Sequence, residues 1–334
     1  MNSFASKDKV DAVVKKIKSL GYKTHKIVGV ERTVIAAVGD ERGKARLQSL
    51  ESLPGVESVM PILKPYKLAS REFRKENTNI RVGKIVIGAK KIVIIAGPCS
   101  VESIDQMLAA AVAVKKAGAT VLRGGAFKPR TSPYSFQGLE EEGLKILARV
   151  REKTGLPFVT EIMDTTDVDM VADYSDMLQV GARNVQNFAL LKKLGKIKKP
   201  ILLKRGMMTT MSEFLMSAEY ILSEGNNKVI LCERGIRTFE TETRNTLDLS
   251  CVPVMKSKSH LPIIVDPSHG VGLVEYVPSM AKASIAAGAD GLMIEMHPNP
   301  EEAFSDGQQS LNPAGFTELI KGLKPFIKAA GRTL

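Results

Sequence analysis

Residues 92–123 read IVIIAGPCSVESIDQMLAAAVAVKKAGATVLR and contain one strand, one helix and a second strand. The apolar runs at 92–96 and 120–123 are short and rich in β-branched residues, which predicts buried strands. Between them, residues 104–117 carry apolar side chains at helical spacing. Two strands joined by a helix of this length run parallel, so the stretch indicates an α/β fold.

The same strand-and-helix pattern recurs eight times after residue 91. Each apolar run ends in a polar or glycine-containing segment, and successive runs start 19 to 37 residues apart, which leaves room for a crossover helix. No GxGxxG phosphate fingerprint follows the first run, which weakens a doubly wound Rossmann alternative. We therefore predict an α/β fold of the (β/α)8 TIM-barrel type. The predicted strands are 92–96, 120–123, 157–161, 176–180, 200–204, 228–233, 261–266 and 291–295.

The first 64 residues predict a separate, small α+β domain. Their order of elements matches a ferredoxin-like split βαβ unit that lacks the strand expected before its first helix. The start of the chain, MNSFAS, is short and mostly polar, so we expect this first strand to be truncated, replaced or absent. The predicted elements are helices at 8–20 and 41–50 and strands at 23–28, 33–38 and 56–62.

The remaining chain divides into a connecting segment and the barrel. Residues 65–90 predict a linker and a β-hairpin, because strand-like runs flank a Gly83-Lys84 turn. The barrel domain is predicted to span 91–334, after a first domain at 1–64.

Composition limits the class of protein and its partners. The chain has 334 residues, a net charge of +12 and three cysteines without a CxxC pair, so we expect no disulfide framework. No apolar run approaches the roughly 20 residues that span a bilayer, and the polar start lacks a signal peptide's apolar segment. We therefore expect a cytoplasmic protein without a membrane partner.

The positive charge fits nucleic acid, an acidic membrane surface or small anionic substrates. Base-stacking residues are scarce, because the chain has no Trp and only 5% aromatic residues. The cations after residue 97 also cluster where predicted strands end. We favour small anionic substrates over nucleic acid.

Charged and metal-binding side chains follow nearly every predicted strand. In a barrel the carboxyl ends of all strands share one face, so these side chains converge. One charge after one strand is usually a solvated boundary residue, whereas a set on one face indicates a site. The set is Cys99, Arg123, Lys128, Arg130, Glu161, Arg183, Lys204, Glu233, Arg234, Asp266, His269 and Glu295.

The loop at 122–138, LRGGAFKPRTSPYSFQG, has the composition of a phosphate cradle. Its two adjacent glycines allow close backbone approaches, and two prolines restrict the backbone around the polar residues. Arginine forks and lysine point charges suit a dianion such as a phosphate ester, although a solvated surface loop is the alternative. The polar residues are Lys128, Arg130, Thr131 and Ser132.

Cys99, His269 and Glu295 offer a thiolate, an imidazole and a carboxylate from strands that meet at the mouth. Asp306, in the loop after the last strand, is a fourth candidate ligand. Mixed sulfur, nitrogen and oxygen donors fit Zn, Mn, Fe or Co better than Mg or Ca. Two alternatives stay open here, since Cys99 can be a buried small hydrophobe and His297 competes with His269.

The mouth holds more cations than one phosphate requires. Two anionic groups or two phosphorylated substrates are therefore expected. Lys204 at a strand end also fits a Schiff-base aldolase, but the adjoining Arg205 favours anion binding at least as strongly. The cations are Arg123, Lys128, Arg183, Lys204 and Arg234.

Seven motifs in this order resemble the 3-deoxy-D-arabino-heptulosonate 7-phosphate (DAHP) synthase family, in its short-chain form with a ferredoxin-like N-terminal domain. They cover most of the chain. The motifs are IAGPCSVE (95–102), LRGGAFKPRTSPYSFQG (122–138), QVGARNVQNF (179–188), LLKRG (202–206), LCERGIRTFE (231–240), DPSHG (266–270) and IEMHPNPEEAFSDGQQSL (294–311).

The resemblance implies a metal-dependent condensation of phosphoenolpyruvate with erythrose 4-phosphate and water, the first step of the shikimate pathway. It implies one divalent metal ion, and Lys128 as proton donor with Asp266 as an orienting residue. The implied metal ligands are Cys99, His269, Glu295 and Asp306. The implied phosphoenolpyruvate residues are Arg123, Lys128, Arg183, Lys204 and Arg234, and the implied erythrose 4-phosphate residues are Arg130, Thr131 and Ser132.

The resemblance also implies regulation and assembly. The N-terminal domain would bind an aromatic amino acid as feedback inhibitor, and the chain would form a homo-oligomer, a tetramer. The expected loss of the first strand bears directly on this role. The nearest rival is the sister enzyme that uses arabinose 5-phosphate, whose loop resembles KANRS where residues 128–132 read KPRTS. A catalytically idle barrel has little support, because every metal and anion position is filled.

Overall fold

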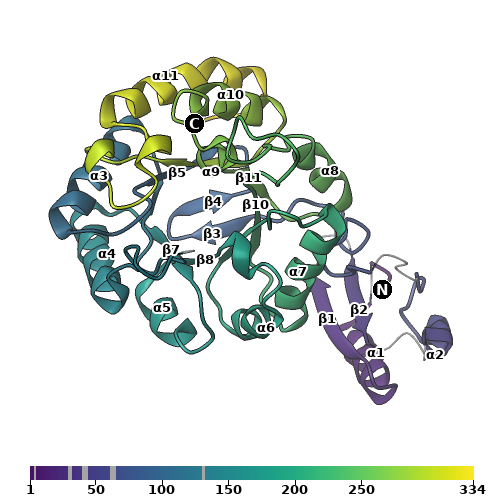
Figure 1. Cartoon of the computed structure of the whole chain (residues 1–334). Helices are drawn as coiled ribbons and strands as arrows, with labels where there is room; N and C mark the ends of the chain where they lie inside the picture. Colours follow the sequence, from purple (N-terminus) through teal and green to yellow (C-terminus); the bar gives the residue numbers. More distant parts are fainter. Residues whose placement is uncertain (4, 29–31, 40–43, 61–64, 130–131) are drawn as a thin grey trace. The chain divides into compact units, whose positions relative to one another are not determined.

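The computed structural model describes residues 1–3, 5–28, 32–39, 44–60, 65–129 and 132–334 (Figure 1). The chain forms two compact units, Met1–Lys75 and Glu76–Leu334. Within the described ranges, no helix is both long and apolar enough to cross a membrane.

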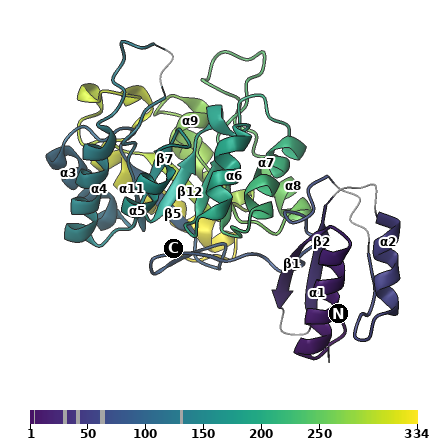
Figure 2. The same ribbon diagram turned by 90° about the horizontal axis from the view of Figure 1, so that it is seen from below.

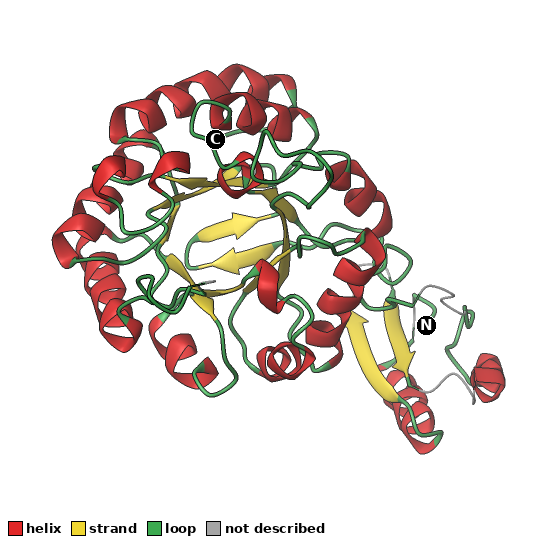
Figure 3. Ribbon diagram, in the orientation of Figure 1, coloured by secondary structure: helices red, strands yellow, loops and turns green. Residues whose placement is uncertain are grey.

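The larger unit is a closed barrel of eight parallel strands surrounded by helices (Figure 3). Around the barrel the strands follow the order β10-β11-β12-β5-β6-β7-β8-β9, so the first and last strands of the barrel pair with each other. This confirms the predicted (β/α)8 fold, with each strand within two residues of its expected position. The strands are β5 (Val93–Gly97), β6 (Val121–Arg123), β7 (Phe158–Ile162), β8 (Met177–Val180), β9 (Ile201–Lys204), β10 (Val229–Glu233), β11 (Ile263–Val265) and β12 (Gly291–Glu295).

Alternation of side chains along each strand brings charged residues to the inside of the barrel mouth. Val121 and Leu202 belong to the apolar cluster inside the barrel. Arg123 and Lys204 lie two residues further along the same strands and therefore point to the same side. The same relation holds for Val159 and Glu161, Met177 and Gln179, Ile264 and Asp266, and Met293 and Glu295.

The helices have local start and stop signals that fit their positions. Helix α3 begins at Ser103, whose side chain accepts a hydrogen bond from the Gln106 N–H, and it ends at Gly118 in the left-handed region. Thr210 and Glu213 form a capping box at the start of α7. The helices of this unit are α3 (Ile104–Ala117), α4 (Glu140–Thr154), α5 (Val168–Tyr174), α6 (Phe188–Lys196), α7 (Met211–Ser223), α8 (Cys251–Lys258), α9 (Pro267–Val271), α10 (Val277–Ala286) and α11 (Pro313–Ala329), with short 3-10 turns η3 (Ala182–Asn184), η4 (Pro300–Glu302) and η5 (Gly307–Gln309).

A hairpin of β3 (Ile80–Val82) and β4 (Ile85–Ile87) belongs to the barrel unit. Gly83, at φ +58°, makes the turn between its strands. The hairpin's buried side chains join the apolar cluster formed by the inward-facing residues of the barrel strands. In Figure 1 the hairpin is seen through the barrel, and in Figure 2 the long loops after β6 and β10 extend from one end of the barrel.

The smaller unit contains α1 (Lys7–Ser19), the antiparallel pair β1 (Lys23–Val28) and β2 (Thr33–Val38), α2 (Lys44–Gln48) and the 3-10 turn η2 (Ser49–Ser52). The core of this unit is small. Its buried members are Val13, Ile17, Tyr22 and Leu50.

The strand predicted at 56–62 is not formed over the described residues 56–60, and residues 61 and 62 lie outside the described ranges. The Val59 N–H donates instead to Glu51 Oε1 at 3.0 Å. In a split βαβ sheet this strand pairs with the first strand, and none of the described residues before Lys7 is in a strand. Residues 56–60 therefore lack a neighbouring strand to pair with.

Candidate active site

A polar cavity of about 420 Å³ opens at the mouth of the barrel. Among the described residues that line it, cations outnumber carboxylates. The cations are Lys128, Arg183, Lys204, Arg234, Arg237 and Arg244, and the carboxylates are Glu161 and Asp306.

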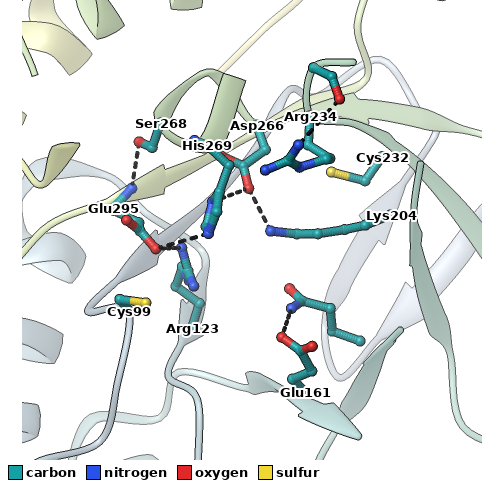
Figure 4. A network of polar contacts seen from close by, with 12 residues as sticks. Cys99, Arg123, Glu161, Lys204, Cys232, Arg234, Asp266, Ser268, His269 and Glu295 are labelled. Carbon is teal, nitrogen blue, oxygen red and sulfur yellow. Dashed lines mark hydrogen bonds and ion pairs between the residues drawn. The ribbon is translucent and has the colours of Figure 1, made fainter. Parts of the chain in front are cut away.

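The four predicted metal ligands lie close together, and Figure 4 shows three of them, Cys99, His269 and Glu295. The Cys99 sulfur and one oxygen each of Glu295 and Asp306 lie within 4.8 Å of one another. His269 Nε2 is 3.5 Å from Glu295 Oε1 and 4.0 Å from Asp306 Oδ2. We call Cys99, His269, Glu295 and Asp306 the ligand cluster. Its thiol, imidazole and two carboxylates form a donor set suited to a transition metal.

His269 is oriented by Asp266, which immediately follows β11 and caps helix α9. Its Nδ1 lies 2.8 Å from Asp266 Oδ2, and its backbone N–H donates to Asp266 Oδ1 at 2.9 Å. These contacts leave Nε2 directed at the two carboxylates of the ligand cluster. Burial lowers the pKa of His269, which favours the neutral imidazole that a metal requires.

Asp266 stays ionised although it is fully buried. Burial alone would raise its pKa, but His269 and Lys204 outweigh burial and hold that pKa well below its usual range. Lys204 Nζ donates to Asp266 Oδ2 at 2.6 Å. Asp266 therefore links one cation of the anion-binding set to the histidine of the ligand cluster.

Lys128 reaches back from the loop after β6 to Cys99. Its Nζ donates to Cys99 Sγ at 2.9 Å and to the Cys99 carbonyl oxygen at 3.1 Å. Burial, helped by Glu295, raises the pKa of the Cys99 thiol to about 12. Burial opposes the charge on Lys128, but Cys99 and Glu161 raise its pKa overall. Lys128 is therefore an ammonium group at neutral pH.

His297 does not take part in the ligand cluster. Its Nε2 lies 3.4 Å from Glu102 Oε2, and its Nδ1 accepts the Asn299 N–H at 3.1 Å. Both ring nitrogens are thereby engaged away from the ligand cluster. The geometry therefore groups His269, and not His297, with the other three candidate ligands.

The remaining predicted cations differ in their partners. Arg123 Nη1 donates to Glu295 Oε1 at 2.6 Å, deep in the barrel. Arg183 and Arg234 have no ion-pair partner within the described part of the chain, and each donates only to a backbone carbonyl. Two arginines that line a cavity without carboxylate partners can bind anions.

The loop at 122–138 reaches the cavity through Lys128 and Ser132. Arg130 and Thr131 lie outside the described residues. Gly138 adopts φ +103°, and a Cβ there would collide with the Ala126 carbonyl oxygen, so this position requires glycine.

Glu233 does not project into the cavity, contrary to the expectation from its place at a strand end. It accepts hydrogen bonds from Arg205 Nη1 at 2.9 Å and from the Gly235 N–H at 2.6 Å. Arg205 Nη1 also donates to Asp248 at 2.8 Å. This buried network fixes the ends of β9 and β10.

Sequence reasoning missed four residues at the mouth. All four lie in long loops, inside or just after the motifs quoted above. Their closeness to these motifs is the only feature of the sequence that points to them. The residues are Arg237, Arg244, Asn245 and Gln309.

Comparison with known proteins identifies the same family for both units. A family described as "DAHP synthetase I family" matches residues 70–329, and one described as "DAHP synthase ferredoxin-like domain" matches residues 1–64. A phospho-2-dehydro-3-deoxyheptonate aldolase of Thermotoga maritima is 52% identical over 327 residues, covering 98% of this chain and 96% of the relative. A 2-dehydro-3-deoxyphosphooctonate aldolase of Syntrophobacter fumaroxidans is 31% identical over 71% of this chain and 88% of its own length.

Two solved structures from Thermotoga maritima are similar over long stretches. The crystal structure of its phospho-2-dehydro-3-deoxyheptonate aldolase (DAHP synthase) has a TM-score of 0.80 at 50% identity, covering 99% of this chain and 97% of that one. A truncated form of its 3-deoxy-D-arabino-heptulosonate 7-phosphate synthase has a TM-score of 0.75 at 49% identity, covering 80% of this chain and 98% of that one. With its barrel and its ferredoxin-like region both matched, this chain belongs to the DAHP synthetase I family.

Proposed function

We propose that this chain condenses phosphoenolpyruvate with D-erythrose 4-phosphate and water to give DAHP and inorganic phosphate, the first step of the shikimate pathway. The observation that carries the proposal is one cavity lined by His269 and Asp306 of the ligand cluster and also by Arg183 and Arg234. These two arginines have no carboxylate partner in the described residues. The 52% identity to the Thermotoga maritima enzyme over nearly the full chain supports the same reaction.

The ligand cluster fits one divalent ion of Mn, Zn, Fe or Co. Its donors are a soft sulfur, a neutral imidazole and two carboxylates, and they are buried or half-buried around one point. Such an ion, when bound, polarises the aldehyde carbonyl of the sugar phosphate as a Lewis acid.

Two groups of residues bind the substrates in this proposal. The first group provides cations suited to the phosphate and carboxylate of phosphoenolpyruvate, and all of them except Arg123 line the cavity. The second group holds the phosphate of erythrose 4-phosphate. The first group is Arg123, Lys128, Arg183, Lys204 and Arg234. The second is Arg130, Thr131 and Ser132, of which Ser132 lines the described cavity.

Lys128 donates the proton in the carbon–carbon bond-forming step. As carbon 3 of phosphoenolpyruvate attacks the aldehyde carbon, the aldehyde oxygen takes a proton from the Lys128 ammonium. Water then adds to the oxocarbenium at carbon 2 and releases one proton, which balances the proton that Lys128 gave up. The bond from carbon 2 to the phosphate oxygen then breaks, the remaining hydroxyl proton leaves with the phosphate, and carbon 2 becomes a ketone. Asp266 keeps His269 and Lys204 in place throughout.

The four-carbon sugar is preferred to the five-carbon sugar on the evidence of the loop. Residues 128–132 read KPRTS, where the arabinose 5-phosphate enzymes resemble KANRS. The relatives named 2-dehydro-3-deoxyphosphooctonate aldolase are 30 to 33% identical to this chain, well below the 52% of the deoxyheptonate enzyme.

Product analysis tests the proposal. The protein, with phosphoenolpyruvate, erythrose 4-phosphate and Mn²⁺, is expected to form a seven-carbon 3-deoxy sugar acid phosphate that mass spectrometry identifies. The absence of any condensation product while both substrates remain intact would remove this function.

We further propose that residues 1–64 form a regulatory domain and that residues 65–90 connect it to a catalytic barrel at 91–334. In this proposal the chain acts in the cytoplasm, and it assembles as a homo-tetramer. Within the smaller unit, a cavity of about 250 Å³ is lined mainly by apolar residues, among them Val13, Ile17 and Tyr22. An apolar cavity of this size supports binding of tyrosine or phenylalanine.

Residues 76–334 alone are expected to keep catalysis and to lose inhibition by tyrosine or phenylalanine. Every described site residue lies in this unit, and a truncated relative of matching extent has been solved as a structure. Phosphate release by the full chain and by the truncated chain, each with either amino acid, measures both effects. Inhibition that survives truncation would place the effector site in the barrel unit, and a full chain that responds to neither amino acid would remove the regulatory proposal.

A further inference from the structure

Arg244, in the loop between β10 and α8, contacts both carboxylates of the ligand cluster, one directly and one through a glutamine. Its Nη1 lies 3.3 Å from Asp306 Oδ1 and donates to Gln309 Oε1 at 2.8 Å. Gln309 is fully buried, and its Nε2 donates to Glu295 Oε2 at 2.6 Å. A continuous chain of hydrogen bonds therefore joins Glu295 to Asp306 through Gln309 and Arg244.

The chain of hydrogen bonds engages the outer oxygen of each carboxylate. Arg244 binds Asp306 through Oδ1, while Oδ2 lies 3.1 Å from Cys99 Sγ. Gln309 binds Glu295 through Oε2, while Oε1 lies 3.5 Å from His269 Nε2. Asp306 Oδ2 and Glu295 Oε1 thus face the remaining donors, and Glu295 Oε1 also accepts a hydrogen bond from Arg123 Nη1 at 2.6 Å.

The backbone around Arg244 is fixed to the helix that carries the histidine. The Arg244 N–H donates to the Val271 carbonyl oxygen at 2.9 Å, and Asn245 Nδ2 donates to the His269 carbonyl oxygen at 3.0 Å. Gly272 adopts φ +75°, and a Cβ there would collide with Cβ of Arg244, so the stem of the arginine packs closely against α9. Residues 244 and 245 thus connect α9 to the loop after β12.

We propose that Arg244 and Gln309 are positioning residues that set the spacing of Asp306, Glu295 and His269 for metal binding. The inference rests on the proposed function, because it takes the ligand cluster as the metal site. Partners that orient metal ligands typically change metal affinity 10- to 100-fold when they are removed. Arg244 and Gln309 act through the ligands and touch no reacting atom in this assignment.

The test measures Co²⁺ binding to the metal-free protein, with no substrate present. Titration gives the Kd, and the near-ultraviolet band of the Cys99 thiolate–Co²⁺ bond reports the geometry of the site. Arg244→Met keeps the stem that packs against Gly272 and removes the donors, so we expect binding about 10- to 100-fold weaker with an altered band. Arg244→Lys keeps the charge and is expected to recover part of the affinity.

Gln309 provides a second test, and the neighbouring residue Gln308 provides its matched control. Gln309→Leu removes the donor to Glu295 and is expected to weaken Co²⁺ binding by a similar factor, whereas Gln308→Ala removes an exposed side chain and should leave the Kd unchanged. The double variant Arg244→Met/Gln309→Leu should lose less than the product of the single losses, because both residues belong to one chain of hydrogen bonds.

Two results separate this inference from the proposed function. If the natural protein forms no condensation product but Arg244→Met still weakens Co²⁺ binding, the positioning role stands and the proposed reaction fails. If the natural protein forms DAHP and both Arg244→Met and Arg244→Lys bind Co²⁺ with an unchanged Kd and spectrum, the positioning role is overturned. Circular dichroism confirms that each variant is folded, and the lysine variant replaces the methionine variant if the latter is not.

Discussion

Removal of the divalent metal with a strong chelator is expected to abolish condensation, and addition of Mn²⁺, Zn²⁺, Co²⁺ or Fe²⁺ is expected to restore it. The ligand cluster is the physical reason, because its donors surround one point, and two of the nearby cations, Arg123 and Lys204, are already engaged with Glu295 and Asp266. Lewis-acid stabilisation contributes several kcal/mol, so a loss of at least about 100-fold in kcat is expected. Phosphate release from phosphoenolpyruvate measures the effect.

The variant Cys99→Ser distinguishes the role of Cys99 as a metal ligand from its role in the packing of the fold. The side chain is 2% exposed and the change keeps its volume nearly constant, so the fold should persist while a harder oxygen weakens metal binding. Cys251→Ser is the matched control, because Cys251 is also buried but lies outside the ligand cluster. Full activity in exhaustively demetallated protein would contradict the metal-dependent mechanism.

Lys128→Ala is expected to lower kcat by about 10²- to 10⁴-fold, the range that a positioned proton donor contributes. The Lys128 ammonium is buried and directed at the ligand cluster through Cys99, so no solvent group replaces it. Steady-state kcat measures the loss, and Co²⁺ binding by the variant separates a lost proton donor from a lost metal.

Lys145→Ala is the control for charge, since Lys145 lies on the outer face of α4 and pairs with Glu141 on the same helix. It should leave kcat unchanged. A Lys128→Ala variant that retains kcat within about threefold would remove Lys128 from the proton-donor role.

The barrel and the charged residues at the ends of its strands were predictable from the sequence, because both depend on short-range patterns. A buried parallel strand is an apolar run whose side chains alternate between the inside and the outside of the barrel. A charge at an inward-facing position of a strand end, such as Arg123 or Glu295, therefore faces the mouth. The same reasoning placed Lys204 and Asp266 correctly at the barrel mouth.

The contacts that were not predictable join residues far apart in the chain. Arg244 reaches Asp306 and Gln309, which lie 62 and 65 residues away, through loops without periodicity. Helix α9 was also missed, because it is only five residues long and depends on capping by Asp266. For Glu233 the strand-end pattern wrongly predicted a side chain that faces the barrel mouth. Arg205 and the Gly235 N–H instead hold its carboxylate inside a buried network.

In the smaller unit, the strand predicted at 56–62 is not formed over the described residues 56–60, where no neighbouring strand is available to pair with it. Residues 56–60 have strand-like composition, yet a strand needs a partner to satisfy its backbone groups. The prediction depended on a first strand to pair with, and none of the described residues before Lys7 is in a strand.

Parallel assays with two sugars test the central claim, that this barrel joins phosphoenolpyruvate to a four-carbon aldose phosphate. Phosphate release is followed with phosphoenolpyruvate, Mn²⁺ and either erythrose 4-phosphate or arabinose 5-phosphate. A phosphate held by the loop at 128–132 fixes the distance from its anchor to the ligand cluster, so the longer sugar should place its aldehyde poorly. We expect kcat/KM to be at least about tenfold higher with erythrose 4-phosphate, a difference of about 1.4 kcal/mol. Equal or faster release with arabinose 5-phosphate would contradict the assignment.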